Sequence, residues 1–212
     1  MSTPPDRRTR KRLATRQAIS DAATRLFHER GFDRVTVDEI ANAADVGRMT
    51  VFNHFPRKED MFFDLDERGR EDLLEALLHR DPGMAPIEAM RLFAHRAIEE
   101  QRPYVSFSRE SQNFIETMEA SEPLKARARA IRDELVQVLT AALSEAVGHA
   151  SSDPEAHLAA SLLVTTWAVA LIQAHEAFRS SQSTEEAQAI FLSLVDRGTV
   201  GLNAMMAGTP YA

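Results

Sequence analysis

The spacing of apolar residues along the chain predicts helices almost throughout. Between residues 10 and 30 the apolar positions recur at i, i+3, i+4, i+7 and i+8, the period of a helix that buries one stripe. These positions are Ile19, Ala22, Ala23, Leu26 and Phe27. Gly31 follows, and glycine accepts the left-handed conformation that commonly ends a helix. Because no segment shows the sustained two-residue alternation of a half-buried strand, the chain is predicted to be all-α.

Two short helices are predicted next, separated by a turn. The first covers residues 36–43, where Thr36 and Glu39 stand at the two ends of a capping box. The second covers residues 48–54, with Gly47 as an acceptable N-cap. A helix followed by a short helix, a turn and a further helix makes up the helix-turn-helix module, whose last helix enters the major groove of DNA. A three-helix bundle with a mixed polar surface is the alternative that the pattern leaves open.

The two faces of the helix at residues 48–54 differ in chemistry. Val51 and Phe55 share the face that must point into the small core. The opposite face and its flanks carry Arg48, Met49, Thr50, Phe52, Asn53 and His54. Guanidinium, amide, hydroxyl and imidazole groups hydrogen-bond base edges and phosphates, so this face is the candidate DNA-binding surface.

Beyond the helix-turn-helix the pattern predicts a second, larger helical domain. Its helices are expected at residues 58–79, 86–101, 104–119, 122–147, 154–180 and 184–206, separated by Pro, Gly and polar residues. We therefore expect a DNA-binding domain over residues 1–56 and an effector-binding and dimerisation domain over residues 57–212. The longest apolar run, residues 159–172, is shorter than the ~18 residues of a membrane span. A buried helix is expected there, with no membrane partner.

Charge is unevenly distributed along the chain. The net charge is -7, yet residues 1–20 carry six basic side chains against one carboxylate, whereas residues 61–212 carry 13 basic and 23 acidic ones. A basic end on an acidic molecule fits a DNA-facing surface. Residues 1–11 are expected to form a basic, flexible arm, and a merely solvated tail is the alternative. This start has no apolar run and is not a secretory signal, so a cytoplasmic protein is expected.

Enzyme chemistry has no support in the sequence. The absence of cysteine excludes disulfides, thiol nucleophiles and cysteine-ligated metals. No Gly-rich phosphate loop, nucleophile elbow or HExxH spacing occurs. We expect no catalytic residue, no metal site and no cofactor.

A series of motifs between residues 12 and 65 carries a family resemblance. They are Arg16-Gln17-Ala18-Ile19, Ala22-Ala23, Leu26-Phe27, Gly31-Phe32, Thr36-Val37, Ile40-Ala41, Ala44, Val46, Thr50-Val51-Phe52, His54-Phe55 and Lys58-Glu59. Together they resemble the TetR family of regulators, which the remainder matches in length and helical character. The resemblance implies an N-terminal helix-turn-helix, a ligand-sensing C-terminal domain, homodimerisation and, usually, repression relieved by a small molecule. It also implies a bacterial protein that works at the nucleoid.

The resemblance also assigns roles to single residues. Three match positions that typically contact phosphate: Thr50, His54 and Lys58. Three others sit where the family varies and reads sequence: Arg48, Met49 and Asn53. Thr36 combines capping with a phosphate contact. Each has a plain alternative as a surface residue, and His54 has the alternative of packing against the next helix.

Two residues depart from the family pattern. Phe52 replaces the usual tyrosine, so a phosphate hydroxyl contact is absent and Phe52 is expected to pack against sugar. Gly47 replaces the usual serine cap. Both departures predict a lower affinity for DNA without loss of the module.

The last two helices are the expected dimer interface. The run at residues 159–172 is apolar on every side, so it must be covered on more than one face. The final helix adds Ala187, Ile190, Phe191, Leu194 and Val195, followed by Gly198 and Gly201, where backbones can approach closely. We hypothesise that these helices pair with their symmetry mates in a four-helix interface. Packing within one chain is the alternative.

The effector site is predicted from polar and aromatic groups on otherwise apolar helices. The candidates are His95, Tyr104, Phe107, Asn113, Phe114, Thr117, Met118, Trp167 and His175. Such a pocket suits a hydrophobic or aromatic effector, although each of these residues has the alternative of being plain core or surface. The predicted function is a homodimeric repressor that leaves double-stranded operator DNA when a small molecule of unknown identity binds. An activator, or a constitutive DNA-binding regulator without an effector, is the alternative.

Overall fold

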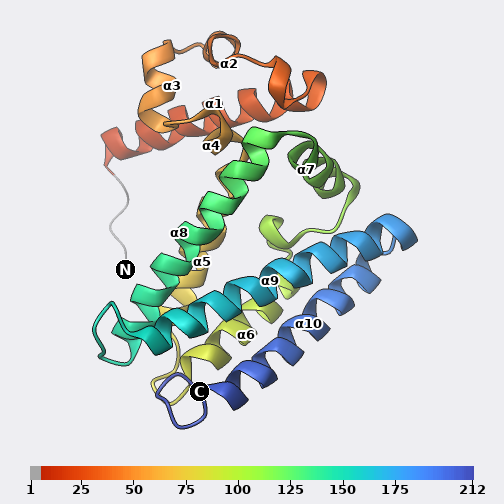
Figure 1. Cartoon of the computed structure of the whole chain (residues 1–212). Coiled ribbons are helices and arrows are strands. Elements are labelled where there is room, and N and C mark those ends of the chain that lie inside the picture. The colour runs from red at the N-terminus through yellow and green to blue at the C-terminus, as the bar shows by residue number, and fades with distance from the viewer. Residues whose placement is uncertain (1–5) are drawn as a thin grey trace. The chain divides into compact units, whose positions relative to one another are not determined.

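The structure is a computed structural model that describes residues 6–212, apart from the side chains of residues 65 and 66. Figure 1 shows that every regular element in this range is helical, which confirms the predicted all-α class. The contacts divide the chain into two compact units. The first contains the residues up to Asp64 together with Thr117–Arg127, and the second contains Leu65–Glu116 and Ala128–Ala212.

The first helix, α1 (Arg7–Arg30), begins earlier than predicted. The carboxylate of Asp6 accepts a hydrogen bond from the backbone N–H of Thr9 at 2.7 Å and caps the helix. Residues 7–11, expected to form a flexible arm, are therefore helical; the arm's residues 1–5 lie outside the described residues. The helix ends where predicted, at Gly31, which has φ 79° and donates to the carbonyl of Phe27 at 2.9 Å.

A short 3-10 turn, η1 (Phe32–Arg34), leads to the helix-turn-helix. The predicted capping box of α2 (Val37–Ala43) is present, with Thr36 and Glu39 bonded to each other's backbone N–H groups. The turn to α3 (Arg48–His54) contains Asp45 at φ 50°. The N–H of Val46 donates to the carbonyl of Ala41 at 3.0 Å, which closes the end of α2.

The predicted helix over residues 58–79 is in fact two helices. α4 (Lys58–Phe62) ends at Phe63, whose backbone leaves the helical region, and α5 (Asp64–Leu78) follows. The break lets two successive aromatic rings pack differently. Phe62 packs against Phe27 and Phe32, with ring centroids 6.2 and 5.8 Å away, while buried Phe63 packs edge-on against Phe62, with ring centroids 5.1 Å apart. α4 packs on α1 and contributes to this core, so the first compact unit includes α4 and extends beyond residue 56, where the sequence predicts the DNA-binding domain to end.

The second unit contains the remaining helices. They are most of α5 together with α6 (Pro86–Glu99), a 3-10 turn η2 (Pro103–Val105), most of α7 (Arg109–Ala120), most of α8 (Glu122–Ala146), α9 (Pro154–Ser181) and α10 (Thr184–Met205). Four of these helices match the predicted ranges closely. α7 starts five residues late, because Pro103 opens a 3-10 turn and the hydroxyl of Ser108 accepts from the N–H of Ser111 at 3.3 Å. Tyr104 and Phe107 therefore precede α7.

The antiparallel pair of α9 and α10 forms the most extensive helix contact in the second unit (Figure 1). Gln182, in the left-handed region at φ 56°, and Ser183 connect them. Gly198 allows their close approach, since a Cβ built there would lie 2.3 Å from Cγ2 of Thr166.

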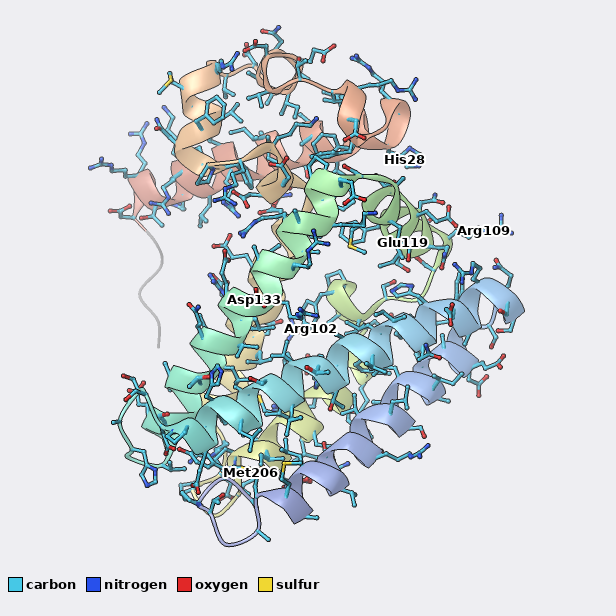
Figure 2. All side chains as sticks on the ribbon, in the orientation of Figure 1. His28, Arg102, Arg109, Glu119, Asp133 and Met206 are labelled. Carbon is cyan, nitrogen blue, oxygen red and sulfur yellow. The ribbon has the colours of Figure 1, made fainter. Side chains whose placement is uncertain are left out.

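A buried tyrosine near residue 212 stabilises the end of this unit where α9 begins and α10 ends. Met206, labelled in Figure 2, ends α10 inside the core cluster that also contains Tyr211. The Tyr211 hydroxyl donates to Oδ2 of Asp153 at 2.7 Å, and Oδ1 of Asp153 caps α9. These contacts lower the pKa of Asp153 to about 2, with the Tyr211 hydrogen bond as the largest cause.

Candidate nucleic-acid interface

The burial pattern of α3 agrees with its predicted faces. Val51 and Phe55 are fully buried. Arg48, Met49 and Asn53 are exposed, and Met49 keeps 70% of its surface accessible although it is a large apolar residue. An apolar side chain held at the surface of a polar helix face is suited to contact with the methyl group of thymine. The outward groups are therefore an amide, a guanidinium and a thioether.

The side chain of Arg48 is held on both sides. Its Nη1 lies 2.7 Å from Oδ2 of Asp38 on α2, and its guanidinium carbon lies 5.5 Å from the ring centroid of Phe52. Phe52 is half-buried. The ring that replaces the family's tyrosine thus supports an arginine on the same helix. Sequence reasoning did not single out Asp38, because its contact with Arg48 depends on how α2 and α3 pack.

Thr36 is exposed at the start of α2, but its hydroxyl is already in use. Oγ1 donates to Oε2 of Glu39 at 2.8 Å and accepts from the N–H of Glu39 at 3.3 Å. Glu39 also lies 2.8 Å from Nη1 of Arg30. The N–H of Thr36, followed by its hydroxyl and Arg30, lowers the pKa of Glu39 to about 2. A phosphate contact by Thr36 would have to share the hydroxyl with this carboxylate.

Thr50 and His54, expected to contact phosphate, are both half-buried on α3. Burial lowers the pKa of His54 from its usual value, and the charges of Arg12 and Arg16 lower it further. The carbonyl of His54 accepts from Nη1 of Arg16 at 3.0 Å. Arg16 also pairs with Asp64 and lies 4.3 Å from the ring centroid of Phe55. Arg16, counted above with the basic end, is therefore bound into the unit.

Lys58 opens α4, as expected, and lies over aromatic rings. Its Nζ is 4.1 Å from the ring centroid of Phe32 and 5.9 Å from that of Phe27. Burial lowers the pKa of Lys58, and nearby carboxylates, with Asp33 the strongest, act in the opposite direction. The rings hold the stem of the side chain and fix the place of its charge.

The corner between α7 and α8 belongs to the same unit, which the sequence did not predict. Ser121 donates to Oδ1 of Asp33 at 2.9 Å. Nε of Arg127 donates to Oδ1 of Asp60 at 2.7 Å, and Oδ2 of Asp60 accepts from the N–H of Arg57 at the start of α4. No local pattern signals the Ser121–Asp33 and Arg127–Asp60 contacts, because the partners in each are more than 60 residues apart.

In the second unit, four of the predicted effector residues lie in one chain of rings. Its neighbouring pairs, with centroid separations of 5.1 to 6.3 Å, are Tyr104–Phe93, Phe93–Trp167, Trp167–Phe191, Phe191–Phe107 and Phe107–His175. The Tyr104 hydroxyl donates to Oδ2 of Asp72 at 2.8 Å, and burial together with this bond raises the pKa of Tyr104. Nδ1 of His175 is buried without a hydrogen-bond partner, and burial lowers the pKa of His175.

The other five predicted effector residues lie outside this chain of rings. His95 belongs to an ion-pair network on α6 and α10, with Nε2 2.8 Å from Oδ1 of Asp196. Asn113 is exposed and Phe114 is half-buried on α7. Thr117 and Met118 fall in the first unit. The structure thus groups Tyr104, Phe107, Trp167 and His175 and leaves the other candidates, the aromatic Phe114 among them, elsewhere.

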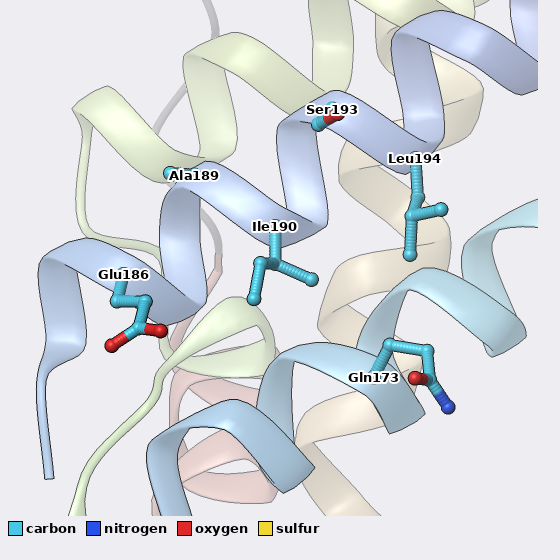
Figure 3. A pocket seen from close by; sticks show the side chains of 6 residues that line it. All are labelled: Gln173, Glu186, Ala189, Ile190, Ser193 and Leu194. Carbon is cyan, nitrogen blue, oxygen red and sulfur yellow. The ribbon is translucent and has the colours of Figure 1, made fainter. Parts of the chain in front are cut away.

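The outer sides of α9 and α10 carry exposed apolar residues. They are Leu158, Val169 and Ile172 on α9 and Val200 and Met205 on α10. A shallow groove of about 490 Å³ lies between the two helices. Figure 3 shows three of the side chains that line it, Ile190 and Leu194 on α10 and Gln173 on α9. Gly201 faces open space, since a Cβ built there meets no atom within 4 Å.

Two further features of residues 6–212 concern other kinds of site. Within residues 6–212 no group of three or more His, Asp or Glu side chains is placed to hold a metal ion. In the same range one helix, α9, is long and apolar enough to cross a membrane, with a mean hydropathy of 1.5 in its most apolar stretch. The whole of α9 is long enough to span a membrane, whereas residues 159–172 alone are too short. Core helices of soluble proteins can be as long and as apolar.

Comparison with known proteins agrees with this geometry. A helix-turn-helix with an exposed polar recognition face, followed by a helical unit, defines a transcriptional regulator. The family profile described as bacterial regulatory proteins, tetR family, matches residues 19–65. The transcriptional repressor BepR of Brucella suis biovar 1 is 30% identical over 171 residues, which cover 74% of this chain and 79% of BepR. The chain belongs to the TetR family.

Other relatives match over different lengths. The regulator TcmR of Streptomyces glaucescens is 37% identical over 91 residues, and this match spans 42% of the chain and only 40% of TcmR. SmeT, the repressor of the Stenotrophomonas maltophilia multidrug efflux pump SmeDEF, has the same fold with a TM-score of 0.53 at 21% identity, covering 88% of this chain and 89% of SmeT. SmeT has also been solved as a complex with triclosan. These relatives are named as regulators, and membership of their family makes this chain a transcriptional regulator.

Proposed function

We propose that the protein is a homodimeric repressor that binds double-stranded operator DNA through α3 and is released by a small, largely hydrophobic or aromatic effector. The observation that carries the proposal is the two-faced burial of α3. Val51 anchors the helix in the core while Arg48, Met49 and Asn53 face outward. In this proposal those three residues read base edges, and Thr50, His54 and Lys58 hold phosphates, with Thr36 at the edge and Phe52 against sugar.

DNA binding is tested with two variants that act on different kinds of contact. Arg48→Ala should lower the preference for operator over scrambled duplex. Lys58→Met keeps the apolar stem over Phe32 and removes the charge, so it should weaken binding to all duplexes alike and reduce the salt slope by about one. Fluorescence anisotropy at several salt concentrations measures both. Arg179→Met, an exposed charge on α9, is the control. An unchanged salt slope for Lys58→Met would contradict its phosphate role.

A second copy of the chain is the proposed cover for the outer face of α9 and α10. Val169 and Ile172 on one helix and Val200 on the other leave an apolar surface that water would otherwise solvate. A twofold pair would also set two recognition helices about one DNA turn apart. Sedimentation at micromolar concentration should show a dimer for the wild type and monomers for Ile172→Glu or Val200→Glu. Leu78→Glu, equally exposed but on α5, should remain dimeric.

The chain of rings around Trp167 is the proposed place for the effector. Aromatic walls with a few polar groups suit a hydrophobic ligand, and Nδ1 of His175 is a buried polar atom without a partner. Binding to the folded protein must raise the melting temperature, so a compound library can be screened by thermal shift. His175→Phe keeps the ring against Phe107 and should change which compounds bind.

Release from DNA follows as a population shift. The effector has to bind the form that does not fit the operator more tightly than the form that does. In this proposal α4, which begins with Lys58, moves when the ligand binds and changes the spacing between the two recognition helices of the dimer. Loss of operator binding on adding a compound that raises the melting temperature supports the repressor mechanism. A compound that binds without affecting DNA affinity favours a constitutive regulator, and one that strengthens binding favours an activator. We place the protein in the bacterial cytoplasm, at the nucleoid.

A further inference from the structure

An aspartate lies on the same surface as the proposed DNA contacts. Asp38 is on α2 and Arg48 is the first residue of α3, and their side chains meet at 2.7 Å across the helix-turn-helix. The two side chains are 59% and 58% exposed, so the pair is at the surface and outside the core. A carboxylate in this place repels DNA phosphates, and its presence needs a reason.

Stability does not supply that reason. Exposed ion pairs stabilise a fold only slightly, because water and salt screen them. α2 and α3 already pack against each other and contribute buried Ile40, Ala41 and Val51 to the core, and the capping box secures the start of α2 itself. Removing the carboxylate should leave the unit folded.

The position of the arginine supplies a better reason. Only Nη1 of Arg48 bonds to Asp38, and the ring of Phe52 lies 5.5 Å from the guanidinium on the same helix. The other nitrogens of the planar fork stay available for a second, bidentate partner, and guanine presents two acceptors with the matching geometry in the major groove. An arginine already held in place loses less conformational freedom when it binds.

The geometry points to Asp38 as a positioning residue for sequence selectivity: it holds Arg48 toward a guanine edge and disfavours the alternative in which Arg48 swings to a phosphate. This inference rests on the proposed DNA-binding role of α3. Asp38 touches no base in this scheme and acts only through Arg48. Its removal therefore should change which sequences bind more than how tightly DNA binds overall.

The test uses duplexes selected by the wild-type protein from a randomised 30-base-pair library, together with a scrambled duplex of the same composition. The quantity measured is the selectivity ratio, which is the dissociation constant for the scrambled duplex divided by that for the selected duplex. Asp38→Asn should lower this ratio by about tenfold, the effect expected for one disordered bidentate base contact. It should do so while binding to the scrambled duplex stays equal or becomes stronger, and circular dichroism melts should show an unchanged fold.

Asp45→Asn is the matched control. It removes the same charge from an exposed position in the same helix-turn-helix, Asp45 has no ion pair within the described part of the chain, and asparagine accepts its positive φ. If the carboxylates act only by repelling phosphates, both variants will strengthen binding to both duplexes by the same factor, and the inference is overturned.

A double-mutant cycle tests whether Asp38 acts on sequence selectivity through Arg48. In an Arg48→Ala background, Asp38→Asn should have no further effect on the selectivity ratio. In the native background, Asp38→Glu keeps the carboxylate and should lower the ratio less than Asp38→Asn does. A full effect of Asp38→Asn without Arg48 would overturn the inference and leave the proposed function intact. Failure of the wild type to enrich any sequence would overturn the proposed function itself, and the role of Asp38 with it.

Discussion

Nε of Arg127, in the first turns of α8, donates to Oδ1 of Asp60 on α4 at 2.7 Å, and the two side chains are only 16% and 19% exposed. The DNA-binding unit is therefore held together by a contact between segments 67 residues apart. The same aspartate caps the start of α4 through its other oxygen. One side chain thus orders the helix that begins with Lys58 and fastens it to the corner of α7 and α8.

We predict that Arg127→Met lowers the free energy of unfolding by about 2 kcal/mol, because a partly buried carboxylate then loses its charged donor. Urea denaturation followed by circular dichroism measures the change. Arg132→Met, on the same helix with a mostly exposed side chain, should change stability by less than about 0.5 kcal/mol. Equal effects of the two variants would mean that the Asp60 contact stabilises nothing.

The turn of the helix-turn-helix predicts a second effect. Asp45 has φ 50°, where a β-carbon costs about 1–2 kcal/mol unless the residue is Gly, Asn or Asp. Asp45→Val should therefore destabilise the protein by at least that amount, while Asp45→Gly should be close to neutral. Thermal melts distinguish them, and a Gly variant as unstable as the Val variant would contradict this account.

Two glycines of α10 should respond differently to the same substitution. Gly198→Ala places a methyl group 2.3 Å from Thr166 and must force α9 and α10 apart, at a cost of about 1–3 kcal/mol. Gly201→Ala meets nothing within its own chain and gains up to about 1 kcal/mol of helix propensity. Urea denaturation measures both. Weaker self-association of Gly201→Ala, measured by sedimentation, would add support for the proposed dimer.

The capping box of α2 predicts an acid-sensitive step. The pKa of Glu39 falls from its ordinary value of 4.5 to about 2 in the folded protein, mainly because the N–H of Thr36 donates to it. A lowered pKa in the folded state contributes stability that is complete above pH 4.5 and is lost as the pH falls toward 2. Glu39→Gln should therefore flatten the pH dependence of the melting temperature between pH 4.5 and 2. Glu176→Gln, which removes only an exposed pair with Arg179, should retain that dependence.

His54 links the proposed phosphate contact to pH. Its pKa lies below the usual value in the free protein because of burial and of Arg12 and Arg16. A phosphate nearby would raise that pKa, so DNA binding would take up a proton, and affinity would rise as the pH falls through the pKa of the DNA-bound form toward the lowered pKa of the free form. His54→Gln should remove this part of the dependence, as measured by anisotropy in parallel buffers, whereas exposed His28→Gln should not. An identical pH profile for His54→Gln and the wild type would show that His54 touches no phosphate.

Local signals predicted the helix-turn-helix well. The capping box at Thr36, the stop at Gly31 and the buried stripe through Val51 and Phe55 all depend on residues within one or two turns of each other. The sequence predicts too late a start for α1, because the run of basic residues after Asp6 gives no sign that Asp6 caps a helix. It does not indicate the break at Phe63, because two adjacent aromatic residues fit a continuous helical pattern as well as an interrupted one.

The parts of the site that sequence did not reveal depend on packing between distant segments. Asp38 reaches Arg48 only because α2 and α3 cross, and Arg127 reaches Asp60 only because the chain returns after 60 residues. The chain of rings also depends on packing between distant segments. The chemistry of Tyr104 and Trp167 marks them as candidates, but no local pattern indicates that Phe93 lies between them.

The apolar residues left exposed on α9 and α10 also bear on the amount of protein in a cell. If a second copy covers them, unfolding and dissociation are linked, and the melting temperature rises with protein concentration. A cell that holds few copies, close to the dimer's dissociation constant, would then carry a mixture of paired and single chains. Because single chains lack the second DNA-binding unit, the number of dimers able to bind the operator would rise more steeply than the copy number in that range. The dependence would approach the square of copy number well below the dissociation constant, so small changes in synthesis would have large effects on the genes controlled.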